Sequence, residues 1–61
     1  MTYGELKKRL RQIGCYPFRQ GGNHEIWYSP ITRNTFPVGR HNSQEVRPGT
    51  LKSIKDKSGL K

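Results

Sequence analysis

Apolar residues recur at helical spacing in the first part of the chain, at Tyr3, Leu6, Leu10 and Ile13. Intervals of three and four residues place these side chains on one stripe of a helix, with Lys8 and Arg11 on the opposite side. Thr2 and Glu5 stand three residues apart, the pattern of a capping box that satisfies free backbone N–H groups of the first turn. Gly14 supplies the left-handed residue with which many helices end. The pattern therefore predicts a helix from Thr2 to Gly14.

The spacing changes to the alternation of strands after this helix. Tyr16 and Phe18 alternate around Pro17. Because proline lacks the N–H that a central strand donates to a neighbour, we expect this strand at the edge of a sheet. A turn is then predicted at Gly21, Gly22 and Asn23.

Residues 24–29 alternate most clearly, with His24, Ile26 and Tyr28 on one face and Glu25, Trp27 and Ser29 on the other. This run predicts a central strand. A turn over residues 30–34 leads to a third strand over residues 35–38, which carries Phe36 and Val38 on one face. Short turns make the meander antiparallel. If Ile26 lies on the core side of the sheet, Trp27 lies on its open face.

A second helix is predicted after the polar loop of residues 39–45. Pro48 fits its first turn, Leu51 and Ile54 point inward, and Gly59 marks its end. The order helix, three strands, helix predicts an α+β fold, in which a three-stranded antiparallel sheet carries two helices on one face. We expect residues 1–61 to form a single domain with a thin core.

The charge of the chain indicates a polyanionic partner. Twelve Lys and Arg against four Asp and Glu give a net charge of +8, and nucleic acid is the commonest polyanion that such a protein meets. Six aromatic residues and the regular apolar spacing favour a folded domain over a disordered basic tail. Because only 30% of the residues are hydrophobic, the core leaves no room for an enclosed cofactor cavity, and a large substrate must bind at the surface.

The lone Cys15 excludes an intramolecular disulfide and a Cys-X-X-Cys redox pair. Two histidines are too few for a protein metal site without carboxylates at suitable spacing, so we expect neither a metal nor another cofactor. The sequence turns polar directly after Met1 and contains no stretch long enough for a membrane span. We therefore expect a cytoplasmic protein without a membrane partner.

Three segments carry a resemblance to a known family: Gly21-Gly22-Asn23-His24-Glu25-Ile26-Trp27, Phe36-Pro37-Val38 through His41, and Pro48-Gly49-Thr50-Leu51-Lys52-Ser53-Ile54. Together they resemble the HicA toxins, over nearly the whole chain. In that family a Gly-Ser-His motif opens the second strand of a fold similar to double-stranded RNA-binding domains. Asn23 stands here where Ser is usual. The resemblance implies a metal-independent ribonuclease that cleaves messenger RNA and is held inactive by a HicB antitoxin.

The chemistry that the resemblance implies needs a base for a 2′-hydroxyl proton, an acid for the leaving oxygen and positive donors around the phosphate. His24 is the leading candidate for the base, because imidazole exchanges protons near neutral pH and the surrounding positive charge favours its neutral form. Glu25 points away from His24 by strand alternation. The structural alternative is that His24 merely caps the edge of the core.

His41 is the only other imidazole and lies in the polar loop after the third strand. It is a candidate for the general acid or for a phosphate contact, and the alternative is an ordinary surface histidine. Glycine backbone ahead of His24 lets a phosphate approach closely. The residues that we expect to contact RNA are Gly22, Asn23, Lys7, Lys8, Arg11, Arg19, Arg40 and Lys52.

Trp27, if it lies on the open face, is a candidate anchor for an acidic HicB-like antitoxin, since tryptophan is enriched at interface hot spots. The alternative is that it covers a neighbouring strand. Two other functions fit the sequence. A non-catalytic RNA-binding module needs the same charge and fold but no working imidazole, and a structural or regulatory protein acts only through protein partners and has no salt-sensitive affinity for RNA.

Overall fold

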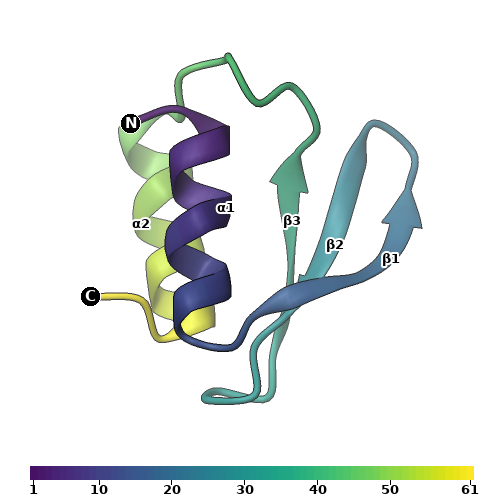
Figure 1. Cartoon of the computed structure of the whole chain (residues 1–61), viewed down its shortest axis with the longest axis vertical. Coiled ribbons are helices and arrows are strands. Elements are labelled where there is room, and N and C mark those ends of the chain that lie inside the picture. Colours follow the sequence, from purple (N-terminus) through teal and green to yellow (C-terminus); the bar gives the residue numbers. More distant parts are fainter.

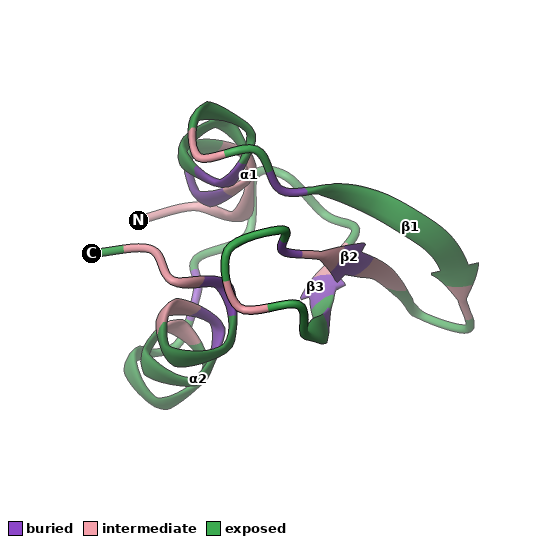
Figure 2. Ribbon diagram, turned by 90° about the horizontal axis from the view of Figure 1, so that it is seen from below, coloured by how far each residue is buried: buried purple, intermediate pink, exposed green.

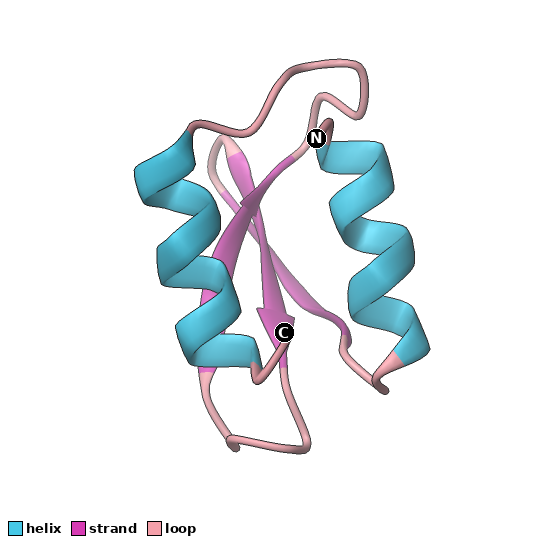
Figure 3. Ribbon diagram, turned by 90° about the vertical axis from the view of Figure 1, so that its left-hand side faces the viewer, coloured by secondary structure: helices cyan, strands magenta, loops and turns pink.

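The computed structural model describes all 61 residues. Its elements follow the predicted order: helix α1 (Tyr3–Gln12), strands β1 (Tyr16–Gly21), β2 (His24–Tyr28) and β3 (Thr35–Gly39), and helix α2 (Pro48–Ser58) (Figure 1). The strands form one antiparallel sheet in the order β1-β2-β3, with β2 in the centre. The two helices lie side by side on one face of this sheet (Figures 2 and 3). The predicted α+β fold is confirmed.

Local capping residues set the helix ends as predicted. The backbone N–H of Glu5 donates to Thr2 Oγ1, and the backbone N–H of Thr2 donates to Glu5 Oε1, which completes the capping box at α1. Gly14 and Gly59 follow the two helices with φ of 93° and 83°, a left-handed conformation that glycine adopts without strain. Pro48 occupies the first turn of α2. Neither helix has the length and apolar character needed to cross a membrane.

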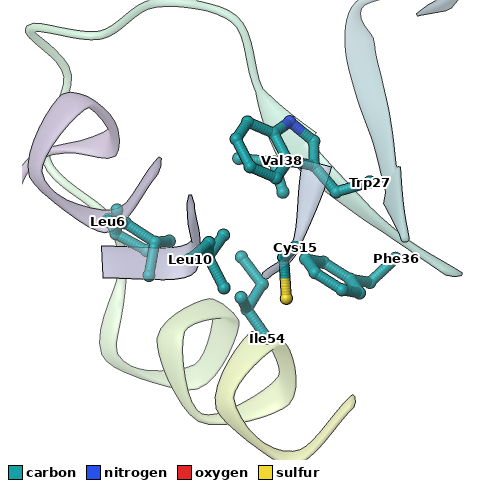
Figure 4. Close-up of a cluster of buried hydrophobic side chains, with 8 residues drawn as sticks. Leu6, Leu10, Cys15, Trp27, Phe36, Val38 and Ile54 are labelled. Atoms are coloured by element: carbon teal, nitrogen blue, oxygen red, sulfur yellow. The ribbon is translucent and has the colours of Figure 1, made fainter. Parts of the chain in front are cut away.

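The core lies between the sheet and the helices (Figure 4). Its buried residues come from every layer of the fold: Leu6, Leu10, Cys15, Trp27, Phe36, Val38, Val46 and Ile54. Trp27 is fully buried. The expectation that Ile26 faces the core and Trp27 faces solvent is therefore wrong. The core uses the Trp27 face of β2, and His24, Ile26 and Tyr28 line the open face.

Strand register explains why the sheet buries this face. Trp27 lies opposite Phe36, and Glu25 lies opposite Val38, so the Trp27 face of β2 continues into the two most apolar residues of β3. Covering the Trp27 and Phe36 rings with α1 and α2 removes more apolar area from water than covering Ile26 would. The polar Glu25 is tolerated on this face because hydrogen-bond donors reach it, as described below.

Candidate functional site

An open cleft of about 370 Å³ lies at the end of the sheet where β2 begins and β3 ends. Its walls come from α1, from the β1–β2 turn and from the β3–α2 loop, and the lining residues are Tyr3, Gly22, Asn23, His24, Gly39, Arg40, His41 and Gln44. Both histidines of the chain thus line one cleft, although 17 positions separate them in the sequence (41 − 24 = 17). Arg40 adds a guanidinium to the same walls.

His24 is the first residue of β2 and is exposed on the open face. Its partners across the sheet are Gly21 on β1 and Gly39 on β3. Both neighbours lack a side chain, and the space that a Cβ would take is filled by the Tyr3 ring at Gly39 and by the Ile26 side chain at Gly21. The alternative that His24 caps the core is wrong, since the core lies on the opposite face.

The loop that carries His41 is held in place by the first turn of α1. The backbone N–H of Tyr3 donates to the Gln44 carbonyl at 3.0 Å, and that of Gly4 donates to the Asn42 carbonyl at 2.9 Å. These N–H groups have no acceptor within a helix, and here the loop supplies one. Gln44 N–H in turn donates to the His41 carbonyl at 3.0 Å. The start of α1 therefore fixes the backbone on which His41 reaches the cleft.

Tyr3 forms an aromatic wall of the cleft. A Cβ atom placed on Gly39 would come within 2.9 Å of Tyr3 Cζ, so the phenol ring packs directly on the bare Gly39 backbone. Gly39 is also the cross-strand partner of His24. The ring, the glycine and the imidazole therefore follow one another across the end of the sheet.

Glu25 and Lys7 are engaged with each other on the helix side of the sheet. Glu25 Oε1 accepts from Trp27 Nε1 at 3.0 Å and lies 3.2 Å from Lys7 Nζ, which also donates to Asn42 Oδ1 at 2.8 Å. The Trp27 hydrogen bond, followed by the interaction with Lys7, lowers the pKa of Glu25. A carboxylate stabilised in this way is a weak base. Neither side chain lines the cleft, and only 12% of the Lys7 side chain is exposed.

The other expected RNA contacts divide into two groups. Gly22, Asn23 and Arg40 line the cleft, and Arg19 is exposed on β1 opposite Ile26, on the open face that His24 shares. A second group lies on the helices, away from the cleft: Lys8, Arg11 and Lys52. The Arg11 guanidinium stacks over the Trp27 ring at 5.1 Å from its centroid, a cation–π contact that helps to cover the core.

Three cleft residues, Tyr3, Gly39 and Gln44, were not identified from the sequence. Tyr3 fitted the apolar stripe of α1 and Gln44 fell within a polar loop, so neither pattern pointed to a site. The signal that could have indicated Tyr3 is its place at the N-terminal end of the stripe, where a long side chain can project past the helix. For Gln44 the sequence offers no comparable signal.

The cleft contains the groups that phosphodiester cleavage requires. Two imidazoles can each accept or donate a proton, the Arg40 guanidinium can pair with a phosphate, and the Tyr3 phenol adds a further hydrogen-bond donor. Nowhere does the structure bring together three or more His, Cys, Asp or Glu side chains in a group that could hold a metal ion. Proton transfer and anion binding are therefore the chemistry that these side chains themselves can supply.

Comparison with protein-family models gives a match over residues 3–60, to the family described as the HicA toxin of bacterial toxin–antitoxin systems. The match spans both helices, all three strands and every residue of the cleft. No curated protein and no solved structure gives a significant match.

Proposed function

The chain belongs to the HicA toxin family of bacterial toxin–antitoxin systems, and from this membership we propose that it is a metal-independent endoribonuclease that cleaves messenger RNA at the His24 cleft. Residues 1–61 act in this proposal as one HicA-like domain. The observation that carries it is the convergence of His24, His41 and Arg40 on the walls of one open cleft. An open cleft suits a polymer that must enter and leave from the side.

In the proposed reaction His24 accepts the proton of a ribose 2′-hydroxyl, and the 2′-oxygen attacks the adjacent phosphorus. The bond from phosphorus to the 5′-oxygen of the next nucleotide breaks, and His41 donates a proton to that oxygen. The products are a 2′,3′-cyclic phosphate and a 5′-hydroxyl, so no water is consumed in this step. Arg40 stabilises the negative charge that develops on the phosphate oxygens.

The partner in this proposal is an acidic HicB-like antitoxin that covers the cleft and keeps RNA out. A complementary negative surface would meet the +8 charge of the toxin and speed their encounter. Trp27 is not its anchor, because that ring is fully buried in the core. Since the substrate is messenger RNA, the toxin acts in the cytoplasm.

Comparing RNA cleavage by the parent protein, His24→Ala and His41→Ala tests the proposal. Loss of a general base or acid lowers rates by about 10²–10⁴-fold, so we expect each variant to fold and bind RNA but to cut it that much more slowly. The assay contains a metal chelator, and an RNA with a single 2′-deoxy nucleotide should resist cleavage at that position. A cyclic phosphate at the new 3′ end identifies the attacking oxygen.

Gln12→Ala is the matched control, because Gln12 is exposed on α1 and lies outside the cleft. It should cleave at the parent rate. Binding without cleavage by the parent itself would favour the non-catalytic RNA-binding module. If His41→Ala keeps full activity while His24→Ala loses it, His41 is not the general acid, and another group of the cleft must donate the proton.

A further inference from the structure

Three aromatic rings gather on the open face of the sheet, outside both the core and the cleft. Tyr16 and Phe18 of β1 are 46% and 57% exposed. The Tyr28 ring of β2 lies close to both, with centroid distances of 5.7 Å to Tyr16 and 6.2 Å to Phe18 and with tilted planes. We call Tyr16, Phe18 and Tyr28 the aromatic platform. No helix covers this side of the sheet, and Figure 2 shows β1 exposed over nearly its whole length.

A β-bulge interrupts β1 at the platform and makes Arg19, instead of Phe18, the partner of Ile26. The β1–β2 register shifts between Pro17 and Arg19, so Phe18 is an extra residue without a cross-strand partner. Regular alternation would send Phe18 to the same face as Tyr16, and a bulge bends the strand and re-aims its side chains. Here both side chains pack against Tyr28. The rings of Tyr16 and Phe18 on the edge strand therefore remain exposed to solvent.

The platform lies on the same face of β2 as the His24 side chain, which also lines the cleft at the end of the sheet. His24, Ile26 and Tyr28 alternate along this face, and four steps of the strand place Tyr28 roughly 13 Å from His24. Arg19 lies beside this path, opposite Ile26. A chain that occupies the cleft can therefore continue along the strand, past a guanidinium, to the three rings.

The charge of this path fits a polyanion. The residues of the open face in strand register with His24, Ile26 and Tyr28 are Gly21, Arg19 and Tyr16 on β1 and Gly39, Pro37 and Thr35 on β3. None is acidic, and Glu25, the only carboxylate on the three strands, belongs to the opposite face. Exposed rings beside an arginine, without any acid, are a composition that suits the binding of single-stranded nucleic acid.

We propose that the open face of the sheet binds unpaired RNA, with bases stacked on the aromatic platform and the strand led along β2 into the His24 cleft. The inference rests on the proposed function, because it names the substrate class of the same site. Bases in a duplex stack on each other and leave no face for a ring, whereas every unpaired base can stack on tyrosine or phenylalanine. The platform therefore selects single-stranded regions of the substrate.

Binding measurements with Phe18 variants test this inference. The full chain carrying His24→Ala is titrated with a labelled oligouridylate of about 12 nucleotides, a length within the range that single-strand sites cover. A parallel titration uses a duplex RNA of the same length. Removal of one stacking partner is expected to weaken single-strand binding by roughly 5- to 100-fold. Phe18→Leu, which keeps apolar area but loses the ring, should show this loss, while Phe18→Trp should bind at least as tightly as the parent.

Ile31→Ala is the matched control, because Ile31 is another exposed large apolar residue, 58% exposed, and lies in the β2–β3 turn. It should leave RNA affinity unchanged. Equal affinity of Phe18→Leu and the parent for the oligouridylate overturns the inference, and so does a duplex bound as tightly as the single strand. Loss of self-association or of antitoxin binding in Phe18→Leu, with RNA affinity retained, would instead assign the rings to a protein interface.

Cleavage assays with the His24-containing protein separate this inference from the function on which it rests. Cleavage that disappears in His24→Ala, together with unchanged RNA affinity in Phe18→Leu, would refute the platform alone. Ring-dependent binding of the single strand by a parent protein that never cuts RNA would refute the nuclease and leave the platform as an RNA-binding surface.

Discussion

Among single residues, Glu25 shows how an unfavourable position becomes a stabilising one. The carboxylate lies on the core side of the sheet, where an unpaired charge would be costly. It accepts a hydrogen bond from Trp27 Nε1, and Lys7 Nζ lies 3.2 Å away. These partners lower its pKa below the ordinary value of 4.5. The charged form is therefore part of the folded structure and links the first helix to the central strand.

This linkage predicts that the free energy of unfolding falls in acid through Glu25. A carboxyl whose pKa is lowered by folding contributes stability that is fully present above its ordinary value and is lost as the pH falls through the folded value. Glu25→Gln keeps an oxygen acceptor for Trp27 Nε1 but removes the charge. Urea unfolding from about pH 7 to about pH 3 should show the parent more stable at neutral pH, with the difference shrinking as the pH falls below about 4.5.

Asp56→Asn provides the control, because Asp56 is an exposed carboxylate of α2 without a salt bridge. Its pH profile should follow that of the parent. A constant difference between Glu25→Gln and the parent across the whole range would mean that shape, and not charge, accounts for the contribution of Glu25.

At the level of elements, the sequence predicted what neighbouring residues determine. Thr2, Gly14 and Gly59 mark the helix ends through local capping chemistry, and Pro17 marks the edge strand. Which face of the sheet is buried was predicted wrongly. Alternation assigns residues to two faces, but which face is buried depends on the apolar residues that β3 and the helices place against it. Glu25 made the Trp27 face look polar in the sequence.

The candidate site was predicted in parts. His24 was identified mainly from the resemblance to the HicA toxins, with the glycines before it as a weaker signal, and Arg40 was identified from its charge. The placement of His41 in the same cleft as His24 depends on backbone hydrogen bonds between the first turn of α1 and the β3–α2 loop. Such contacts use N–H and carbonyl groups that every residue possesses, so residue types do not reveal them.

The turn between β2 and β3 is held to the end of α2 by Ser29. Ser29 is fully buried, and its Oγ donates to the Ser58 carbonyl at 2.6 Å and accepts from the Ile31 N–H at 3.2 Å. Ser29→Ala leaves the carbonyl of the α2 end without this donor, which costs about 1–3 kcal/mol. For a domain of this size, each kcal/mol lowers Tm by roughly 4–8 °C. A thermal melt followed by circular dichroism measures the change.

Ser53→Ala is the corresponding control on α2, because Ser53 is exposed and its hydroxyl makes no hydrogen bond within the protein. Its melt should stay close to that of the parent. If Ser29→Ala melts at the same temperature as this control, the end of α2 is held to the sheet by its apolar contacts, such as that of Ile31 with Gly59, and not by the serine.

For the whole molecule, the sheet separates two surfaces that share the positive charge. One is the open face with His24, Arg19 and the aromatic platform, and the other is formed by α1 and α2 with residues such as Lys52. Net charge attracts RNA to both, but only a surface in direct contact with phosphates releases counterions there. Salt dependence can therefore show on which side the RNA lies, independently of any effect on cleavage.

Arg19→Gln and Lys52→Gln remove one positive charge each, so their effects on net charge are equal. For single-stranded nucleic acid, each neutralised phosphate contributes about −0.7 to the slope of log affinity against log salt concentration. If RNA follows the open face, Arg19→Gln should make the slope shallower by about 0.7, and Lys52→Gln should leave it unchanged. Titrations of the oligouridylate with the His24→Ala chain at several salt concentrations measure both slopes. A shallower slope in Lys52→Gln alone would place the RNA on the helices, and equal changes in both would indicate diffuse attraction without a defined path.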